Sequence, residues 1–482
     1  MTGNTRLKRE IGLFSATAIV VANMVGTGIF TTSGFALQEA GSAAALLLCW
    51  LLGGIFAFCG ALCYGELGTR FPQAGGDYIY LREAFGKPMA FLSGWISLIV
   101  GFSAPIAAAA MAFATYLFKA LGVQASGPIA IPPAGLSLSG HCLPVIPAIA
   151  VVLLLSLVHI HSLRAGSRMQ NLLTLFKVAL VVTFIGAGLF SANGSTDHFT
   201  GSVSLASLAD DRFAVALIFV AFSYSGWNAA AYLGGEICRP QRNIPLALLA
   251  GTGFVTVLYL LMNSVYVYAL PPEQMAGVMA VGDKAAMRLF GAGIGRWFSG
   301  AIALGLLSLI SAMMLAGPRV YYAMSRDGVF FDGFKKIHPR RHTPSHAIGL
   351  QAVVAVLMII TATYDKLLIY MGFTLSLFAI LTVMGLMRLR LKNPASGAAY
   401  RTWGYPVTPL VFILGNIWII VFSLKSRLEP ALWGLATIVF GLVLYFCFVK
   451  FGQSSRTGPA TQNRVVAALL SERGSAGPPP LR

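Results

Sequence analysis

The sequence predicts an all-α polytopic membrane protein of about twelve transmembrane helices. Of its 482 residues, 57% are hydrophobic and only 10% are charged, and the mean hydropathy is +0.77. Ordinary soluble domains contain roughly 25% charged residues. Apolar runs of roughly 20 residues, the length at which a helix crosses a bilayer, recur along the whole chain. This composition excludes a soluble protein with a single hydrophobic core.

Twelve spans follow in order from the apolar runs. They are expected near residues 11–33, 43–66, 89–118, 144–163, 169–190, 212–235, 245–270, 295–322, 346–363, 366–387, 405–424 and 430–449. Residues 1–10 form a basic N-terminal segment. Residues 450–482 have the polar, proline-containing composition of a disordered tail. Since no other linker is apparent, residues 11–449 are expected to form one transmembrane domain.

The first and sixth spans are interrupted by small residues at mid-membrane. The first contains NMVGTGIF at 23–30, and the sixth contains VAFSYSGWNA at 220–229. Glycine inside a helix costs about 1 kcal/mol relative to alanine. Two glycine-interrupted spans that each open a set of five helices indicate an inverted-repeat transporter. We therefore expect broken helices 1 and 6, with repeats at about 11–190 and 212–387 and two extra helices at about 405–449. Close helix packing at small residues is the alternative interpretation.

The basic charge is distributed as a topology signal. With the N-terminus inside, cytoplasmic segments hold 25 of the 34 Lys and Arg residues, outer segments hold 8, and Lys177 lies within a span. The positive-inside rule then places both termini in the cytoplasm, and we expect a bacterial inner membrane protein. Because no soluble basic domain accompanies the net charge of +18, a nucleic-acid partner is not expected.

Unpaired backbone groups at the two interruptions can hold a zwitterion. Free N–H groups at the start of the next half-helix favour a carboxylate. Free carbonyls around Met24 and residues 222–225 can accept from an ammonium group, and glycine lets the ligand approach the backbone. The candidate substrate-binding residues are Met24, Gly26, Thr27, Gly28, Phe222, Ser223, Ser225 and Gly226.

The acidic residues indicate the substrate class. By the span boundaries above, seven of them fall at span ends or in loops and none beside either interruption: Glu39, Glu66, Asp77, Glu236, Asp283, Asp327 and Asp365. A transporter of basic amino acids or polyamines needs an acidic partner for the additional cation. The absence of one favours a neutral amino acid, with a basic amino acid or polyamine antiporter as the alternative.

Lys177, in NLLTLFKVAL, is the one charged residue within a span. A lysine near the inner face can snorkel to the interface. The functional hypothesis is that its ammonium takes the place of a bound cation and bridges the broken first span to Ser311 on the eighth. Sodium would then be unnecessary, and a proton could couple to transport. Phe222 and Trp227 flank the second interruption as candidate gates, although most aromatic residues in spans serve packing.

Other classes of protein find less support in the residues. Cys59 and Cys63 lie at i, i+4 on the second span, a spacing that could hold a metal, but that span has no histidine or second pair, so they are interpreted as buried hydrophobic residues. No metal site or cofactor is therefore predicted, and nothing in the sequence implies an obligatory protein partner. A membrane enzyme would need convergent Asp, His or Cys residues at depth. A channel would need a continuous polar pore. A non-transporting amino acid sensor would use the same binding site and stays open as an alternative from a different class.

Four motifs resemble the amino acid–polyamine–organocation superfamily, most closely its L-type amino acid transporter branch. They are VGTGIF (25–30), YGELGTRFPQAGGDYIYLREAFG (64–86), FSYSGWN with GEICRPQRNIP (222–245), and PRVYYAMSRDG with TPSHAI (318–348). They extend from the first span to the start of the ninth, and the middle two are highly specific. The resemblance implies the leucine-transporter architecture of two inverted five-helix repeats followed by two further helices.

The same resemblance implies roles for individual residues. Gly26, Thr27 and Gly28 match the carboxylate-binding turn. Phe222, Ser223 and Ser225 match the positions whose carbonyls hold the amine, with Phe222 also matching the gating aromatic residue. Lys177 matches the lysine that replaces sodium in sodium-independent members. Ser225 differs from the glycine of many L-type members, which narrows the pocket and favours small side chains. The expected function is sodium-independent transport of neutral L-amino acids by alternating access, through exchange or proton coupling.

Overall fold

The structure is a computed structural model that describes residues 9–123, 129–131, 136–138, 144–199, 210–278, 280–338, 343–361, 364–393, 399–426 and 428–456. Within these residues the chain is almost entirely helical. The one strand pair, β1 (Ile129–Ile131) and β2 (Leu136–Leu138), is antiparallel, with Ala130 opposite Ser137. The predicted all-α fold class is confirmed, with this short hairpin outside the spans.

The first five spans are formed by nine helical segments. These are α1 (Leu13–Met24), α2 (Thr27–Ala40), α3 (Ala43–Arg70), α4 (Asp77–Phe85), α5 (Lys87–Ile96), η1 (Ser97–Ser103), α6 (Ala104–Leu121), α7 (Val145–His161) and α8 (Leu163–Leu189). Side-chain caps and a left-handed glycine set some of the boundaries. Ser42 accepts from the backbone N–H of Ala45 at the start of α3, and Gly41 ends α2 at φ +76°.

The rest of the chain forms the remaining spans and short connecting helices. The segments are η2 (Thr196–His198), α10 (Asp211–Tyr224), α11 (Ala229–Tyr232), α12 (Pro240–Ala269), α13 (Pro272–Met275), α14 (Val281–Phe290), α15 (Ala292–Ala316), α16 (Pro318–Arg326), η3 (Asp332–Lys335), α17 (Ser345–Thr361), α18 (Tyr364–Lys392), α19 (Val407–Ser426) and α20 (Leu428–Arg456). α20 runs to Arg456, seven residues into the tail predicted to be disordered. Residues 457–482 lie outside the described part.

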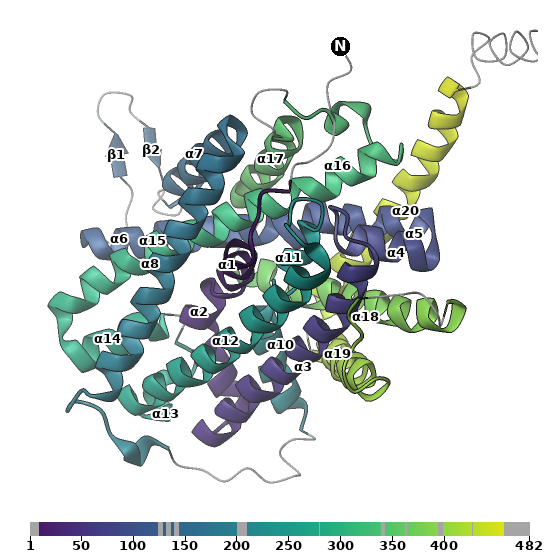
Figure 1. Cartoon of the computed structure of the whole chain (residues 1–482). Coiled ribbons are helices and arrows are strands. Elements are labelled where there is room, and N and C mark those ends of the chain that lie inside the picture. The colour runs from purple at the N-terminus through teal and green to yellow at the C-terminus, as the bar shows by residue number, and fades with distance from the viewer. Residues whose placement is uncertain are drawn as a thin grey trace, which may run out of the picture.

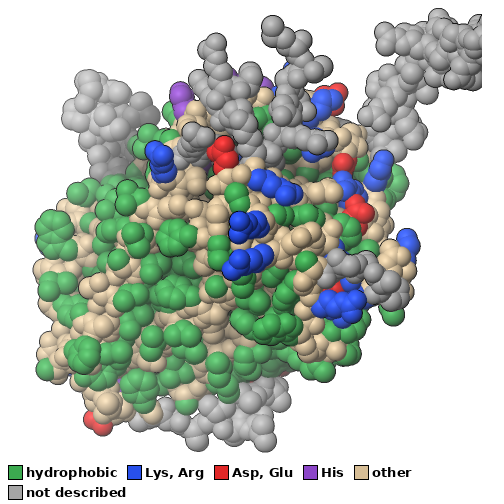
Figure 2. Space-filling view, viewed as in Figure 1, with side chains coloured by type: hydrophobic (Ala, Val, Ile, Leu, Met, Phe, Trp, Pro, Cys, Tyr) green, Lys and Arg blue, Asp and Glu red, His purple; other side chains and the backbone are tan. Residues whose placement is uncertain are grey.

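Helix lengths account for twelve spans. Seven described helical runs are long and apolar enough to cross a membrane, and four shorter apolar helices accompany them. The twelfth is the sixth span, which is divided between α10 and α11. Apolar side chains on the outer faces of these helices, such as Leu172, Val257 and Leu414, are exposed, as expected for surfaces that meet lipid. Figure 2 shows this apolar surface, with most of the visible Lys and Arg side chains toward the end that carries the N-terminus.

The broken spans lie at the centre of the molecule. Figure 1 shows α1 and α2 surrounded by α3, α8, α10 and α12. α1 and α2 pack on α12 and α10, and α3 packs along α12, while α15 packs along α6 and α8. Each interruption is therefore surrounded by protein, which is the condition for non-helical backbone at membrane depth.

The third span contains a π-helical segment that faces the centre. Residues Ser97–Ser103 wind as a π-helix between α5 and α6. Pro105, the second residue of α6, lacks the N–H group that would donate to the carbonyl of Gly101, which explains why regular α-helical pairing fails here. π-Helical segments often occur at functional sites. This one contributes Ser97 and Gly101 to a cavity wall.

Candidate functional site

The sixth span breaks between α10 and α11. α10 ends at Tyr224, Ser225 is extended (φ −55°, ψ 150°), and Gly226 lies in the left-handed region at φ +92°. A Cβ atom at Gly226 would lie 2.8 Å from the Cβ atom of Asn23 on α1. Glycine is required by both the backbone angle and the close neighbour. The predicted break is confirmed, and its turn lies against the first span.

The first span breaks between α1 and α2. Gly26 (φ −123°, ψ −146°) precedes α2 and has no side chain to cap the first N–H groups of that helix. The first turn of an α-helix has no intrahelical acceptors for these donors, and the positive end of the helix dipole lies there. A Cβ atom at Gly28 would lie 2.5 Å from Oγ of Ser223. The second predicted break is therefore also present, and the two breaks touch each other at Gly28 and Ser223.

Lys177 on α8 bonds to the interrupted end of α1. Its side chain is fully buried, and its Nζ atom donates to the carbonyl oxygen of Ala22 at 2.9 Å and to that of Val25. Both carbonyls lie where the break leaves the last turn of α1 without intrahelical donors. The snorkelling alternative is wrong, because the ammonium group points to the break and does not reach the interface. The Lys177 amine therefore lies at the carbonyl end of the first break.

Ser311 on α15 has a different partner from the expected one. Its Oγ atom lies 2.8 Å from Nε2 of His159, a buried histidine near the end of α7. The part of α15 that packs on Lys177 lies further back, at Gly305, where a Cβ atom would be 3.4 Å from Cγ of Lys177. The expected pairing of Lys177 with Ser311 is corrected accordingly. Ser311 is one helical turn beyond Ser308, which bonds to Thr174 of α8 at 3.1 Å.

Tyr259 on α12 joins the two breaks, a role that sequence reasoning missed. Its hydroxyl lies 2.5 Å from the carbonyl oxygen of Met24 and 3.0 Å from that of Ser223. These two carbonyls were expected to be free for a substrate. Since a carbonyl oxygen has two lone pairs, each can still accept from a second donor. The only available signal in the sequence was a tyrosine within an apolar span, whose hydroxyl needs a buried partner.

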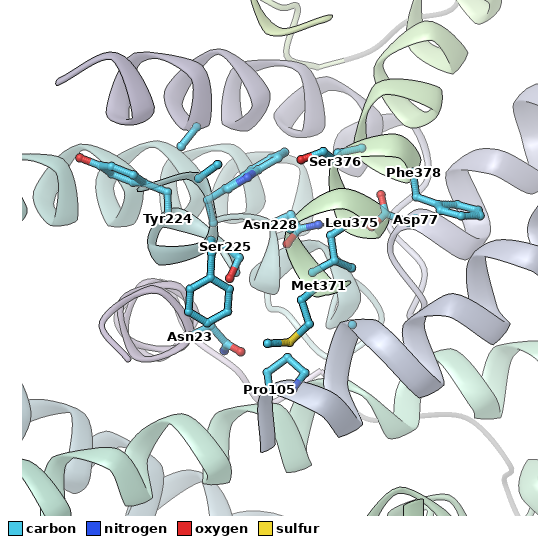
Figure 3. A pocket seen from close by; sticks show the side chains of 18 of the residues that line it. Asn23, Asp77, Pro105, Tyr224, Ser225, Asn228, Met371, Leu375, Ser376 and Phe378 are labelled. Atoms are coloured by element: carbon cyan, nitrogen blue, oxygen red, sulfur yellow. Dashed lines mark hydrogen bonds between the residues drawn. The ribbon is translucent and has the colours of Figure 1, made fainter. Parts of the chain in front are cut away.

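A cavity of about 120 Å³ adjoins the second break (Figure 3). Drug-sized ligands occupy pockets of roughly 300–1,000 Å³, so this space suits a much smaller ligand. The predicted residues Phe222, Ser225, Gly226 and Trp227 line it. Asn23, in the last turn of α1 just before the first break, also lines it. Five predicted residues are not among the described residues of its wall: Met24, Gly26, Thr27, Gly28 and Ser223. The structure therefore connects only part of the predicted site to this cavity.

The wall of the cavity is apolar with a few polar groups. Met313, Met371, Leu375 and Phe378 provide apolar surface in the wall. Figure 3 shows Met371 and Leu375 near Ser225 and Asn228. Besides the aromatic residues Tyr224, Trp227 and Tyr232, the residues with polar side chains are Asn23, Asp77, Ser93, Ser97, Ser225, Asn228 and Ser376. Such a wall fits a small ligand with few polar groups. All of these polar residues except Ser225 were missed, since single serines and asparagines in spans carry no pattern that marks their contact with a cavity.

Asp77 corrects the expectation that no acidic residue lies beside either interruption. It begins α4, is buried, and lines the cavity together with Asn228, the second residue after Gly226. Burial raises the pKa of the Asp77 carboxyl group above its ordinary value, against the effect of the Tyr232, Tyr64 and Thr382 hydroxyl donors. The chain between the second and third spans turns into the protein here, a path that no local pattern in the sequence indicates.

The two candidate gating residues differ in their surroundings. Phe222 lines the cavity at the end of α10. Trp227 also lines it, but its ring packs edge-on against Tyr64 of α3, with centroids 4.7 Å apart, and against Phe412 of α19, at 5.7 Å. These contacts hold the Trp227 ring between two helices. Gating by either residue stays a prediction.

Comparisons with known proteins agree with this architecture. A family model described as "Amino acid permease" matches residues 11–470. The chain is 31% identical over 450 residues to the large neutral amino acids transporter small subunit 2 of Mus musculus. The aligned residues cover 92% of this chain and 82% of that protein.

Two further relatives have names that denote different transport activities. The chain is 30% identical over 476 residues to the b(0,+)-type amino acid transporter 1 of Mus musculus, covering 95% of this chain and 92% of that protein. It is 29% identical over 457 residues to the serine/threonine exchanger SteT of Bacillus subtilis (strain 168), covering 93% of this chain and 99% of that protein. All three names denote amino acid transport or exchange.

Proposed function

The chain belongs to the amino acid permease family, as an integral membrane amino acid transporter and not an enzyme, and on this premise we propose that it carries neutral L-amino acids independently of sodium. Transport proceeds by alternating access, as exchange or with proton coupling. Both termini lie in the cytoplasm, and the membrane is a bacterial inner membrane. The predicted inverted relation of the two five-helix sets supplies the alternating motion.

The position of Lys177 carries the sodium-independent part of the proposal. A sodium ion at the first break would be held by carbonyl oxygens freed from the helix, as in transporters with discontinuous helices. In this protein the Lys177 ammonium group bonds to the carbonyls of Ala22 and Val25. A second cation at the same oxygens would face an unscreened like charge in a low-dielectric interior. The amine therefore replaces the metal ion.

The polar groups of the cavity support the proposed substrate class. Its polar groups are mostly neutral hydroxyls and amides, and the one carboxylate, Asp77, accepts hydrogen bonds from protein donors at both of its oxygens. A cationic side chain would have to displace those donors. The names of two relatives, for large neutral amino acids and for serine and threonine, agree with a neutral substrate.

A basic amino acid or polyamine antiporter is the second candidate. It is favoured by one observation, the presence of the Asp77 carboxylate in the cavity wall. Uptake of arginine that exceeds uptake of alanine, serine and leucine would select it over the neutral class.

The experiment uses the purified full-length chain, reconstituted alone in liposomes. One relative is named a small subunit, and our proposal assigns no partner subunit to this chain. Labelled alanine, serine, leucine and arginine are offered with and without sodium, at two pH values, and with and without internal substrate. We expect sodium-independent uptake of a neutral amino acid, stimulated by internal substrate or by a proton gradient. A channel would show no trans-stimulation. A sensor or an enzyme would show no uptake, and that result would refute the proposal.

A further inference from the structure

The Asp77 carboxylate accepts hydrogen bonds from four side chains on three parts of the fold: α3, α18, and α11 with its N-cap residue. Oδ1 accepts from the hydroxyls of Tyr64 on α3 and Thr382 on α18, the latter at 3.0 Å. Oδ2 accepts from the hydroxyl of Tyr232 on α11 and from Nδ2 of Asn228 at 3.2 Å. No Lys, Arg or His of the described residues forms an ion pair with it within 4.0 Å. Its two oxygens are thus held by neutral donors alone.

The backbone before Asp77 fixes where this carboxylate lies. The N–H of Gly75 donates to the carbonyl of Tyr232 at 3.0 Å, and Ala74 forms a bridge with Leu233. Gly76 takes φ +52°, and a Cβ atom there would lie 2.5 Å from Cδ1 of the Tyr232 ring. This segment wraps around Tyr232, and it can do so only with glycine at position 76. The turn at residues 74–76 is thus held against Tyr232 and Leu233, and it places Asp77 in the cavity wall.

The bond between Asp77 and Asn228 determines how the Asn228 amide is turned. Carboxylate oxygens only accept, so the NH₂ group of Asn228 must face Asp77. The amide oxygen then points the other way. Figure 3 shows Asn228 between Asp77 on one side and the cavity residues Ser225 and Met371 on the other. The amide oxygen is consequently presented to the cavity, two residues after the Gly226 turn.

We propose that Asp77 is a positioning residue that holds the Asn228 amide with its oxygen directed at the substrate. The Asn228 oxygen then accepts a hydrogen bond from a donor on the substrate, either its ammonium group or a hydroxyl or amide on its side chain. Asp77 itself does not touch the substrate, because both of its oxygens are occupied. This role rests on the proposed function, since it assumes that the cavity receives an amino acid.

The first test is Asp77→Asn, studied in proteoliposomes with L-serine and L-alanine as probes. An amide at position 77 can turn either its NH₂ group or its single oxygen toward Asn228. Asn228 can then be held in either of two orientations, so its oxygen is no longer directed at the substrate. We expect KM for L-serine to rise about tenfold while the maximal rate changes less than about twofold, the pattern of a lost binding interaction. Asp283→Asn is the matched control. The Asp283 carboxylate, on α14, accepts a hydrogen bond from Ser299 of α15 at 2.8 Å and is not among the residues that line the cavity, so its loss should leave KM unchanged.

A double-mutant cycle separates positioning from a general structural role. If Asp77 acts through Asn228, then Asp77→Asn combined with Asn228→Ala raises KM no further than Asn228→Ala alone. Additive effects of the two substitutions on KM would overturn the inference. So would an unchanged KM in Asp77→Asn.

An exchange of the two residues keeps the inference testable where Asp77→Asn alone does not fold. In the double variant Asp77→Asn, Asn228→Asp the amide again donates to a carboxylate, with the roles reversed. We expect its thermal stability in detergent, measured without substrate, to exceed that of either single variant. We also expect L-arginine uptake to appear, because the carboxylate now stands at position 228, where the proposal directs the side-chain oxygen at the substrate. Failure to recover stability would refute the pairing. If instead the unmodified protein carried no neutral amino acid, the proposed function would fail while the stability readout would still report on the pair.

Discussion

At the scale of single residues, the site depends on groups that satisfy broken backbone. Helix ends leave N–H and C=O groups unpaired, and in the bilayer each such group costs several kcal/mol unless it has a partner. Lys177 and Tyr259 are those partners here, from α8 and α12. Their side chains let the first span open at mid-depth without an energetic penalty that would close it again.

We predict that Lys177→Met abolishes exchange. Methionine has a similar length but no donors, so the carbonyls of Ala22 and Val25 are left unpaired, at a cost of roughly 1–3 kcal/mol each. Uptake of the best substrate and its pH dependence would be measured in proteoliposomes. Lys119→Met is the control, because the Lys119 side chain is 40% exposed and its Nζ atom forms a long ion pair with Asp283, at 3.4 Å. Normal, pH-dependent uptake by the Lys177 variant would show that its amine has no part in transport.

We also predict that Gly28→Ala stops transport. The added Cβ atom would lie 2.5 Å from Oγ and 2.7 Å from Cα of Ser223, so the backbone at the contact of the two breaks would have to move. The control is Gly186→Ala on α8, where nothing lies within 4 Å of the new atom. That variant should transport normally and gain up to about 1 kcal/mol of helix stability. Equal behaviour of the two variants in uptake and melting temperature would contradict a close contact at Gly28.

At the scale of elements, segments far apart in the sequence are tied together at the end of the molecule that carries the N-terminus. Ile11, ahead of α1, forms a bridge with Ile237, and the N–H of Cys238 donates to the Ile11 carbonyl at 2.9 Å. In the same segment the buried carboxylate of Glu236 pairs with Arg319 of α16, with both bonds at 3.1 Å. The first, sixth and eighth spans are thereby joined.

The buried ion pair between Glu236 and Arg319 predicts that Glu236→Gln strongly lowers the stability of the protein. Removal of one member of a buried ion pair leaves the Arg319 charge uncompensated, which typically destabilises by about 3–5 kcal/mol. The melting temperature of the purified protein should fall strongly. Asp332→Asn serves for comparison, because the Lys335–Asp332 pair is exposed and such pairs contribute about 0–1 kcal/mol. If both substitutions shifted the melting temperature by the same small amount, the ion pair would not hold the elements together.

At the scale of the whole molecule, the distribution of charge predicts how the protein is oriented in the membrane. The described Lys and Arg residues between spans, such as Arg239, Arg242, Arg326 and Lys335, belong to the segments expected inside. Interior helices such as α1 and α15 are buried on most faces, whereas α8 and α12 present apolar surface to lipid. The excess of positive charge at one end therefore predicts which end of the molecule faces the cytoplasm, and the exposed apolar surface indicates the part that lies within the bilayer.

Reporter fusions test this orientation. Alkaline phosphatase, which is active only outside the cytoplasm, should be active when inserted at Gly194, between α8 and α10, and inactive when fused to the C-terminus. A fluorescent protein that matures only in the cytoplasm should give the opposite result at the C-terminus. Phosphatase activity at the C-terminus would reverse the proposed topology.

The sequence was sufficient for the features that depend on local composition. Twelve apolar runs specify twelve helices because each must satisfy its own backbone hydrogen bonds in lipid. Gly26, Gly28 and Gly226 marked both breaks, and Lys177 stood out because a charge in a span is costly. These are properties of short stretches of chain, so they can be read one stretch at a time.

The tertiary structure decided everything that depends on contact between distant stretches. It paired Ser311 with His159, placed the Tyr259 hydroxyl between carbonyls of both breaks, and turned the segment before Asp77 inward so that the first residue of α4 borders the cavity. Hydrogen bonds act over about 3 Å, and no pattern within one span records which hydroxyl or carboxylate of another span will come that close. The sequence by itself therefore determined the spans, their interruptions and the buried charge. Packing alone determined which groups complete them.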